Sequence, residues 1–211
     1  MKSSEEGRYS ERELKFDASH VSVEHFKRWA FAWPSEESVT VAGTDDYYRH
    51  GVNVIRHRHS QRDNMLTVKC RKTADSIQDR VEVDVRLHRE SPVKDVRAFL
   101  AASGWEPVFS LYKTAEIAWI WSSGLPYDIV NRRFEFTVCF YEVTQIGTDK
   151  PPRRFLEVEF EKDNPYVPAE TIDQLLQTWR ATLTAEFGLG APLSESLFEI
   201  YSGERYIVKG A

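Results

Sequence analysis

Hydrophobic and polar residues alternate with a period of two along most of the chain, a pattern typical of β-strands with two different faces. The alternation predicts strands over 11–16, 38–43, 52–59, 65–71, 80–88, 105–113, 116–121, 132–143 and 155–161, and the strand over 38–43 leads into the TDDYY segment at 44–48. In three places the period lengthens to that of a helix, over 23–33, 91–104 and 169–187. The tail adds a predicted helical turn and a closing strand near 206–208. Together these elements predict an α+β fold.

Residues with known cap preferences mark the ends of the predicted helices. Ser22 is a predicted N-cap of the first helix, and Pro34 forces its end. Pro92 is expected at the first position of the second helix, and Gly188 is the expected C-terminal stop of the third.

The polar positions of the predicted strands carry charges of both signs. In the first strand Glu11, Glu13 and Lys15 share one face, and successive side chains on such a face lie about 6–7 Å apart. The pattern recurs in Arg56 and Arg58; in Thr67, Lys69 and Arg71; in Arg80, Glu82, Asp84 and Arg86; and in Glu157, Glu159 and Glu161. A solvated face explains any one such strand, but open water does not require so many aligned charges.

We expect the sheet to close on itself. Many antiparallel strands with only three long helices favour a β-barrel that carries its helices outside. If the charged faces turn inward, they line a cavity in which opposite charges pair or hold ions, because unpaired charges are costly to bury. No repeat or linker divides the 211 residues, so we expect a single domain over 1–211 with a flexible segment over 1–8.

The charges of this predicted cavity suit a polyphosphate with a bound metal ion. Carboxylate oxygens are the ligands that Mg²⁺ and Mn²⁺ prefer, and the side chains of Arg and Lys match phosphate oxygens. The candidate metal ligands are Glu11, Glu13, Glu82, Asp84, Glu157 and Glu159. The candidate phosphate-binding residues are Lys15, Arg56, Arg58, Lys69 and Arg133.

Several of these segments, in this order, resemble the CYTH domains of the triphosphate tunnel metalloenzyme superfamily. Glu11, Glu13 and Lys15 match the family's ExExK first strand, and the resemblance extends over about residues 11–189. Similar to later strands of the family are TDDYY (44–48), IRHR (55–58), LTVK (66–69), RVEVD (80–84), GWEPVFSLYKT (104–114) and LEVE (156–159). One such motif is weak evidence, whereas the ordered series is specific.

The resemblance implies a closed eight-stranded antiparallel barrel whose tunnel binds a triphosphate and a divalent metal. It adds Lys113 to the phosphate-binding residues and implies that Glu11, Glu13, Glu157 and Glu159 hold Mg²⁺ or Mn²⁺. Two positions depart from the family's pattern. Tyr141 stands where the family has a metal-binding Asp, and Ala115 stands where it has an Arg shortly after the matched Lys. Glu135 shares the predicted face of Tyr141 and could replace the missing ligand.

The activities of that family set the functional expectation. They include hydrolysis of tripolyphosphate, thiamine triphosphate and nucleoside triphosphates, and class IV adenylate cyclisation; the RNA triphosphatases of mRNA capping share the wider superfamily. We expect metal-dependent phosphoryl transfer from a triphosphate to water. The predicted catalytic residues are Lys15, Glu82, Asp84 and Arg133.

Two alternatives stay open at this point. A cyclase making cyclic AMP from ATP would use the same phosphate-binding residues, but it needs a purine–ribose pocket that the sequence does not identify. A module that binds a triphosphate without turning it over is permitted by Tyr141 and Ala115.

Composition narrows the partners. The net charge of −5 argues against a protein dominated by generic nucleic-acid binding. The resemblance implies a small-molecule triphosphate as the partner, with an RNA 5′-triphosphate end as the exception considered. No apolar run approaches the roughly 20 residues that span a bilayer, and we expect a cytoplasmic protein without a membrane partner. A homodimer is left open.

The remaining metal-binding residue types have simpler interpretations. His57 and His59 alternate with Arg56 and Arg58, so they are expected at the surface rather than as metal ligands. Cys70 and Cys139 lie in separate predicted strands without metal-ligand spacing, and free buried thiols are expected.

Overall fold

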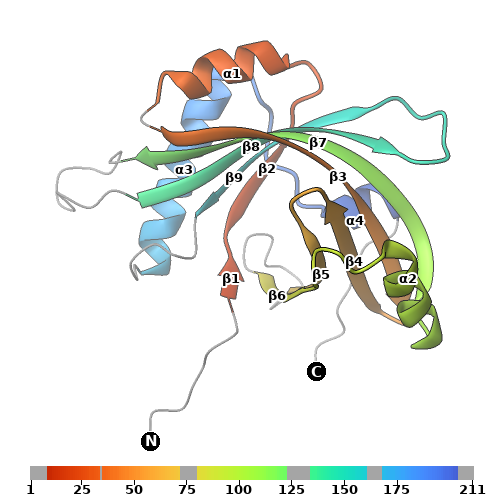
Figure 1. Ribbon diagram of the computed structural model, residues 1–211. Coiled ribbons are helices and arrows are strands. Elements are labelled where there is room, and N and C mark those ends of the chain that lie inside the picture. Colours follow the sequence, from red (N-terminus) through yellow and green to blue (C-terminus); the bar gives the residue numbers. More distant parts are fainter. Residues whose placement is uncertain (1–8, 34, 72–79, 123–133, 161–167, 204–211) are drawn as a thin grey trace, which may run out of the picture.

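One antiparallel sheet forms most of the protein, whose computed structural model describes residues 9–33, 35–71, 80–122, 134–160 and 168–203 (Figure 1). Its strands are β1 Tyr9–Glu11, β2 Glu13–Asp17, β3 Ser35–His50, β4 Asn53–Ser60, β5 Asn64–Arg71, β6 Arg80–Arg86, β7 Glu106–Ser122, β8 Phe134–Gln145 and β9 Arg153–Phe160. The helices are α1 Val23–Phe31, α2 Val93–Ala102, α3 Ala169–Phe187 and α4 Leu197–Ser202. The predicted α+β class is therefore confirmed.

The prediction of a closed eight-stranded barrel is wrong in its closure, and the predicted first strand is split into β1 and β2. The sheet has nine strands in the order β1-β6-β5-β4-β3-β7-β8-β9-β2, so β1 and β2 are its two edges. Arg12 interrupts the predicted first strand: Glu11 pairs with Arg80 of β6, whereas Glu13 pairs with Glu159 of β9. The two edges are thus joined along the chain at one residue, not by a ladder of hydrogen bonds.

Two strands are longer than the alternation predicts. β3 continues from the predicted segment through the TDDYY segment, with a register shift between Tyr47 and Tyr48. Position 43 of β3 requires glycine, because a Cβ there would lie 2.7 Å from Cβ of Ser60 on β4. β7 joins the predicted strands 105–113 and 116–121, because the intervening Thr114 and Ala115 pair with both β3 and β8.

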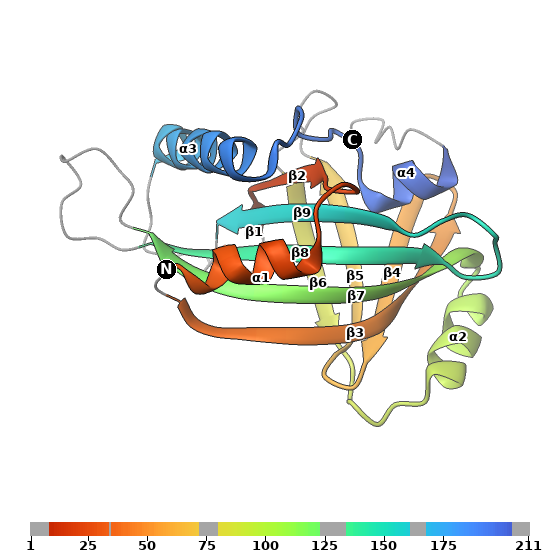
Figure 2. The same cartoon turned by 90° about the horizontal axis from the view of Figure 1, so that it is seen from above.

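The sheet is strongly curved, and its two faces differ. In Figure 1, β3 and β7 arch over β4, β5 and β6, while α1 and α3 lie outside the arch. Seen from above, β9, β8, β7 and β3 run side by side, and α1 lies over β7 and β8 nearly along the strands (Figure 2). The face under α1 and α3 carries the large core, which includes Phe16, Phe26, Phe136, Leu176 and Trp179.

Helix boundaries follow their caps. Oγ of Ser22 accepts a hydrogen bond from the backbone N–H of His25, which confirms the predicted N-cap of α1. Pro92 is the N-cap of α2 and lies one position before the site expected from the sequence. α3 has the predicted bounds and ends at Gly188, whose φ of 66° is the left-handed conformation that glycine adopts readily.

Helix α4 covers an apolar region at one end of the opposite, concave side of the sheet. Leu197 and Phe198 of α4 pack there with Tyr47, Leu111 and Phe155. The predicted turn near the C-terminus is therefore a helix, while the closing strand expected near 206–208 and the flexible segment expected over 1–8 lie outside the described residues.

None of the helices in the described part of the chain is both long and apolar enough to cross a membrane.

The outer core makes a direct prediction for stability. Phe136 is fully buried and contacts the rings of Phe160 and Trp179, with centroid distances of 5.5 and 5.3 Å. Phe136→Ala should lower the free energy of unfolding by about 3–5 kcal/mol, because the removed ring leaves a cavity. Phe99→Ala is the matched control: Phe99 is 65% exposed on α2, so its loss should change stability by no more than about 0.5 kcal/mol. Urea unfolding of both variants measures the difference, and equal effects would contradict this placement of the core.

Candidate functional site

Pairing between the strands brings most of the predicted charged residues onto the concave side of the sheet, here called the inner face. Antiparallel partners point to the same side, so the faces of all strands can be followed through the register. From β2 to β6, the inner face carries Glu13, Lys15, Glu157, Glu159, Cys139, Tyr141, Lys113, Asp45, Arg58, Arg56, Thr67 and Asp84. The charges expected to share one surface therefore do so.

Lys15 lies among the carboxylates at the β2–β9 edge. Its Nζ is 3.0 Å from Oε1 of Glu157 and 3.5 Å from Oε1 of Glu13. Lys15 and Glu13 are both more than 90% buried. Burial raises the pKa of Glu157, but the charges of Lys15 and Lys113 and the hydrogen bond from Tyr141 together outweigh it and hold that pKa below its usual range. The edge is thus a compact group of two carboxylates that share one ammonium and keep a net negative charge.

Tyr141 occupies the inner face of β8 next to this group. Its hydroxyl donates a hydrogen bond of 2.6 Å to Oε1 of Glu157, the oxygen that also faces Lys15. The ring is fully buried and stacks on Phe155. Burial, with the adjacent charge of Glu157, raises the pKa of Tyr141 well above its ordinary value, so the phenol stays a donor. Tyr141 therefore occupies part of the coordination capacity of Glu157.

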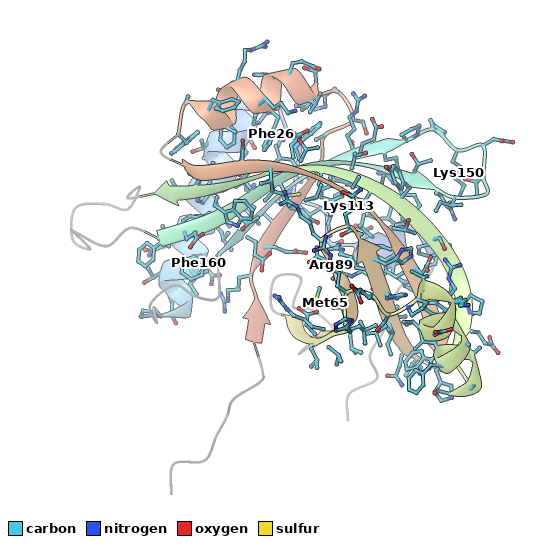
Figure 3. All side chains as sticks on the ribbon, in the orientation of Figure 1. Phe26, Met65, Arg89, Lys113, Lys150 and Phe160 are labelled. Atoms are coloured by element: carbon cyan, nitrogen blue, oxygen red, sulfur yellow. The ribbon has the colours of Figure 1, made fainter. Side chains whose placement is uncertain are left out.

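Lys113 connects the acidic edge to the basic strands. Its Nζ lies 3.5 Å from the centroid of the Tyr141 ring, a cation–π contact. Lys113 is on the side of β7 that faces β4 and β5 (Figure 3). Burial lowers its pKa, and Arg58 adds to that effect, while the negative charges of Glu157 and Asp45 oppose it. An anion arriving beside Lys113 would stabilise its protonated form.

The basic end of the inner face is built on a buried ion pair. Nε and Nη2 of Arg58 donate to the two carboxylate oxygens of Asp45 at 2.8 and 2.9 Å. Asp45 is buried, yet the charge of Arg58 holds its pKa far below the usual range. This two-point contact fixes the plane of the Arg58 guanidinium.

A row of hydrogen-bonded side chains crosses β4, β5 and β6 beside the Asp45–Arg58 pair. Arg56 Nη2 donates to Oγ1 of Thr67 at 3.0 Å, and the Thr67 hydroxyl donates to Oδ1 of Asp84 at 2.7 Å. Thr67 is buried and Asp84 is exposed. Arg56 is therefore oriented by a hydroxyl whose own direction is set by a carboxylate.

For three further predicted site residues the structure gives the backbone pairing, and a fourth lies outside the described residues. The backbone of Glu11 pairs with Arg80 at the other edge, not beside β9, so the expected grouping of Glu11 with Glu13 on one unbroken strand is wrong. The backbones of Lys69 and Glu82 pair with each other in β5 and β6. Arg133 lies outside the described residues.

The two departures from the family's pattern face the inner side together. Ala115 pairs with Tyr141 across β7 and β8, which agrees with the predicted face of both. Glu135 shares this face six residues away on β8 and pairs with Trp121 at the other end of the strand. The side chains next to Tyr141 are therefore Glu157, Glu13 and Lys15, and not Glu135.

Sequence reasoning missed Asp45 and Thr67 as site residues. Asp45 was placed in a strand-entry segment, although extending the alternation of β3 two residues past Gly43 puts it on the inner face. His57 was expected at the surface and is instead completely buried, because α2 and its loops cover that side of β4. Its orientation away from Arg56 and Arg58 is as predicted. The predicted free thiol is confirmed for Cys139, which is buried.

Comparison with known proteins shows the fold and no more. No protein-family model and no curated protein matches the sequence. The structure is similar to the PH1819 protein of Pyrococcus horikoshii OT3, with a TM-score of 0.62 and 20% identity over 92% of this chain and 99% of that one. A conserved hypothetical protein of Pyrococcus furiosus has a TM-score of 0.58 and 16% identity over 90% of this chain and 99% of its own.

The same fold occurs in a multiprotein assembly. A chain of the Schizosaccharomyces pombe Mediator head module has a TM-score of 0.52 and 10% identity, over 88% of this chain and all of that chain. Since identity is this low throughout, the likeness establishes the architecture, and function has to be argued from the inner face.

The Asp45–Arg58 pair predicts a pH-dependent stability. Asp45→Asn should lower the free energy of unfolding at pH 7 by about 1–3 kcal/mol, because it leaves the Arg58 guanidinium without its anion. The pKa of Asp45 is lower in the folded than in the unfolded chain, where it is about 3.9. The stabilisation is therefore complete above about pH 4 and is lost as pH falls further.

Urea unfolding between pH 7 and pH 2.5 tests this sign. The stability gap between wild type and Asp45→Asn should narrow below about pH 4. Asp173→Asn, which removes an exposed carboxylate paired with Arg12, should cost no more than about 1 kcal/mol. A gap for Asp45→Asn that is constant with pH would contradict the ion pair.

Cys139 gives a second check on the inner face. Burial raises the pKa of its thiol to about 11, so at pH 8 about one thiol in a thousand is ionised, against about a quarter in the unfolded chain. Iodoacetamide should modify Cys139 at least about a hundredfold more slowly in the folded protein than in urea. Mass spectrometry of the Cys139 peptide measures both rates, and similar rates would show that this side of β8 is open.

Proposed function

We propose that the protein is a divalent-metal-dependent hydrolase of triphosphates, of the CYTH type, and that the inner face is its active site. The observation that carries the proposal is the single continuous face on which Glu13, Glu157 and Glu159 stand beside Lys15, Lys113, Arg58 and Arg56. Carboxylates and cations in such proximity match a ligand that carries both a metal ion and several phosphate charges.

The donor atoms fit Mg²⁺ or Mn²⁺. Glu13, Glu157 and Glu159 offer carboxylate oxygens from facing positions of β2 and β9, the oxygen-only set that these ions take. A bound ion would supply neutralisation of phosphate charge. Tyr141 and Lys15 already contact Oε1 of Glu157, which leaves its second oxygen as the donor to an ion.

Lys15 is suited to move between two partners. In the free protein its ammonium is shared between Glu13 and Glu157. When a metal–triphosphate complex binds, the carboxylates gain another cation, and Lys15 can bind a phosphate oxygen within reach of its long side chain. The charge balance of the inner face is then kept in both states, so little unpaired charge is buried in either.

The basic strands hold and stabilise the phosphates. Arg56 is oriented by Thr67 and Arg58 by Asp45, so both guanidinium planes are set before the substrate arrives. Lys113 adds a point charge between them and the carboxylates. Such preorganised cations stabilise the charge that develops on the transferred phosphoryl group. Asp84, the exposed carboxylate of this row, is assigned the positioning of the attacking water, with Arg133 and Glu82 as further catalytic candidates.

The proposed site is an open, curved sheet face rather than the closed tunnel of the CYTH fold. β1 continues into β2 across Arg12, so the two edges of the sheet are joined along the chain. Lys69 and Glu11 would complete the phosphate and metal sites on the β1–β6 side. The Pyrococcus likenesses support the architecture and are silent on the reaction.

A module that binds triphosphate without hydrolysis is the second candidate. Tyr141 favours it specifically, because its phenol lies against Glu157 at the position where the family has a metal-binding Asp. The side chain is uncharged and committed to a hydrogen bond, so it offers no carboxylate to a second ion. Adenylate cyclisation is a third outcome, distinguished by its product.

Phosphate release is the direct test. The purified chain is offered inorganic tripolyphosphate, ATP, thiamine triphosphate and a triphosphate-ended RNA with Mg²⁺ or Mn²⁺, and phosphate and cyclic AMP are both measured. We expect metal-dependent release that falls at least about a hundredfold in Glu13→Gln. Glu116→Gln is the matched control, since Glu116 lies on the outer face of β7 and bonds Thr40 and Lys27.

The outcomes separate the three candidates. No release, together with triphosphate binding that weakens in Arg56→Ala, would reject the hydrolase and support the binding module. Cyclic AMP from ATP would identify the cyclase. If neither turnover nor triphosphate binding is detected, the inner face is rejected as a triphosphate site.

A further inference from the structure

A second cluster of metal-binding side chains lies on the other side of β3 and β4 and has no part in the proposed triphosphate site. Asp46 pairs with His57 across the two strands, and His59 follows on the same face of β4. One ring nitrogen of each histidine and one carboxylate oxygen of Asp46 all lie within 4.8 Å of one another. Asp46 and His57 are buried, and His59 is partly exposed.

Asn64 determines the protonation of His57. The side-chain Nδ2 of Asn64 donates to the backbone carbonyls of His88 and Ser91, both at 3.1 Å, so its Oδ1 is the atom that faces His57. That oxygen lies 2.9 Å from Nε2 of His57 and can only accept. Nε2 of His57 therefore carries the hydrogen, and Nδ1 keeps a free lone pair.

The free lone pair of His57 is buried without a partner. His57 is 0% exposed, and no hydrogen-bond donor for its Nδ1 occurs among the described residues. A buried acceptor without a donor is costly, and it calls for an explanation such as an ion. Histidines that bind metals show this arrangement: one nitrogen binds the ion while the other donates to a fixed oxygen.

Asp46 and His59 already have the spacing of two ligands on one ion. Oδ2 of Asp46 is 3.2 Å from Nε2 of His59, and the edge of a tetrahedron with bonds of about 2.0 Å measures about 3.3 Å. Asp46 is held from outside the cluster: Arg97 of α2 donates to its Oδ2, and the Ser110 hydroxyl donates to its Oδ1. The carboxylate is therefore oriented by neighbours as well as by His59.

We propose that Asp46, His57 and His59 bind a transition-metal ion of the Zn²⁺ class, on the outer face beneath α2. Two imidazole nitrogens and one carboxylate oxygen suit Zn²⁺, whereas Mg²⁺ takes oxygen ligands, so this ion differs from the one proposed for the inner face. The hydrogen that His59 Nε2 shares with Asp46 moves to Nδ1 of His59 or to solvent when the ion binds. The fourth position is left to water.

The ion would add to the ion pair, hydrogen bonds and apolar contacts that already join these elements. Its ligands come from β3 and β4, and Arg97 and Asn64 connect them to α2 and to the loop before it. Because no ready-made site exists in the unfolded chain, binding should stabilise the folded protein.

Zinc binding tests the site on the whole purified chain after treatment with a chelator. Isothermal titration with Zn²⁺ should give one bound ion per chain in wild type. The affinity should fall at least about tenfold in His59→Gln, which removes a ligand, and in Asn64→Ala, which removes the oxygen that orients His57. Zn²⁺ should raise the unfolding temperature of wild type and leave that of His59→Gln unchanged. Cobalt substitution should give the absorption spectrum of a tetrahedral site with nitrogen and oxygen ligands.

Two matched variants locate the ion. His25→Gln removes an exposed histidine of α1 that pairs with Glu186, and Glu13→Gln alters the inner face; both should keep wild-type zinc affinity. The proposal is overturned if wild type takes up no stoichiometric zinc, if His59→Gln binds as tightly, or if Glu13→Gln abolishes binding. His59 is partly exposed, so His59→Gln carries the test even if Asn64→Ala does not fold. Neither result depends on triphosphate hydrolysis.

Discussion

The register of the antiparallel sheet is the constraint on which the rest of the structure depends. Side chains alternate strictly along each strand, and paired residues share a face, so one slip of register would exchange the apolar face and the charged face of a whole strand. On the outer face of β2, β7, β8 and β9, apolar residues are buried under α1 and α3; they include Phe16, Ile120, Phe136 and Val158. That burial fixes the register, and the register in turn aligns the charges of the inner face.

The inner face is stable because its charges compensate one another locally. Lys15 offsets part of the charge of Glu13 and Glu157 at one end, and Asp45 neutralises Arg58 at the other. Buried charges without such partners would favour the unfolded chain. The same compensation bears on ligand binding: a polyphosphate that enters with a metal ion adds less net charge to this face than a polyphosphate that enters alone.

Period-two alternation was enough to predict the α+β class and the side of nearly every strand, because that pattern is local. Closure was not predictable from it. The break at Arg12 sends Glu11 and Glu13 to opposite edges of the sheet, and only the pairing partners of β6 and β9 reveal this. The continuity of β7 was also missed, since Thr114 and Ala115 carry no strong strand signal and are held by both neighbouring strands.

The residues of the candidate site were likewise predictable where the signal lay within one strand, and not where it depended on contacts between strands. Residues that alternate within one strand, such as Lys15 or Arg58, could be assigned to the charged face from the sequence. Contacts between strands could not: the bond of Tyr141 to Glu157 and that of Asp45 to Arg58 join residues at least 13 positions apart. Burial of His57 likewise depends on α2 and its loops, which fold back over β4 from more than 20 residues away.

Two consecutive aspartates show how one strand can serve two separate chemistries. Asp45 turns inward and orients Arg58, an arrangement suited to a phosphate, while Asp46 turns outward to His57 and His59, an arrangement suited to a metal with nitrogen ligands. Both are buried, so each needs its own cationic partners, Arg58 on one side and Arg97 on the other. The backbone of β3 and β4 separates the two groups. A change confined to the outer cluster can therefore reach the inner face only through the position of these strands.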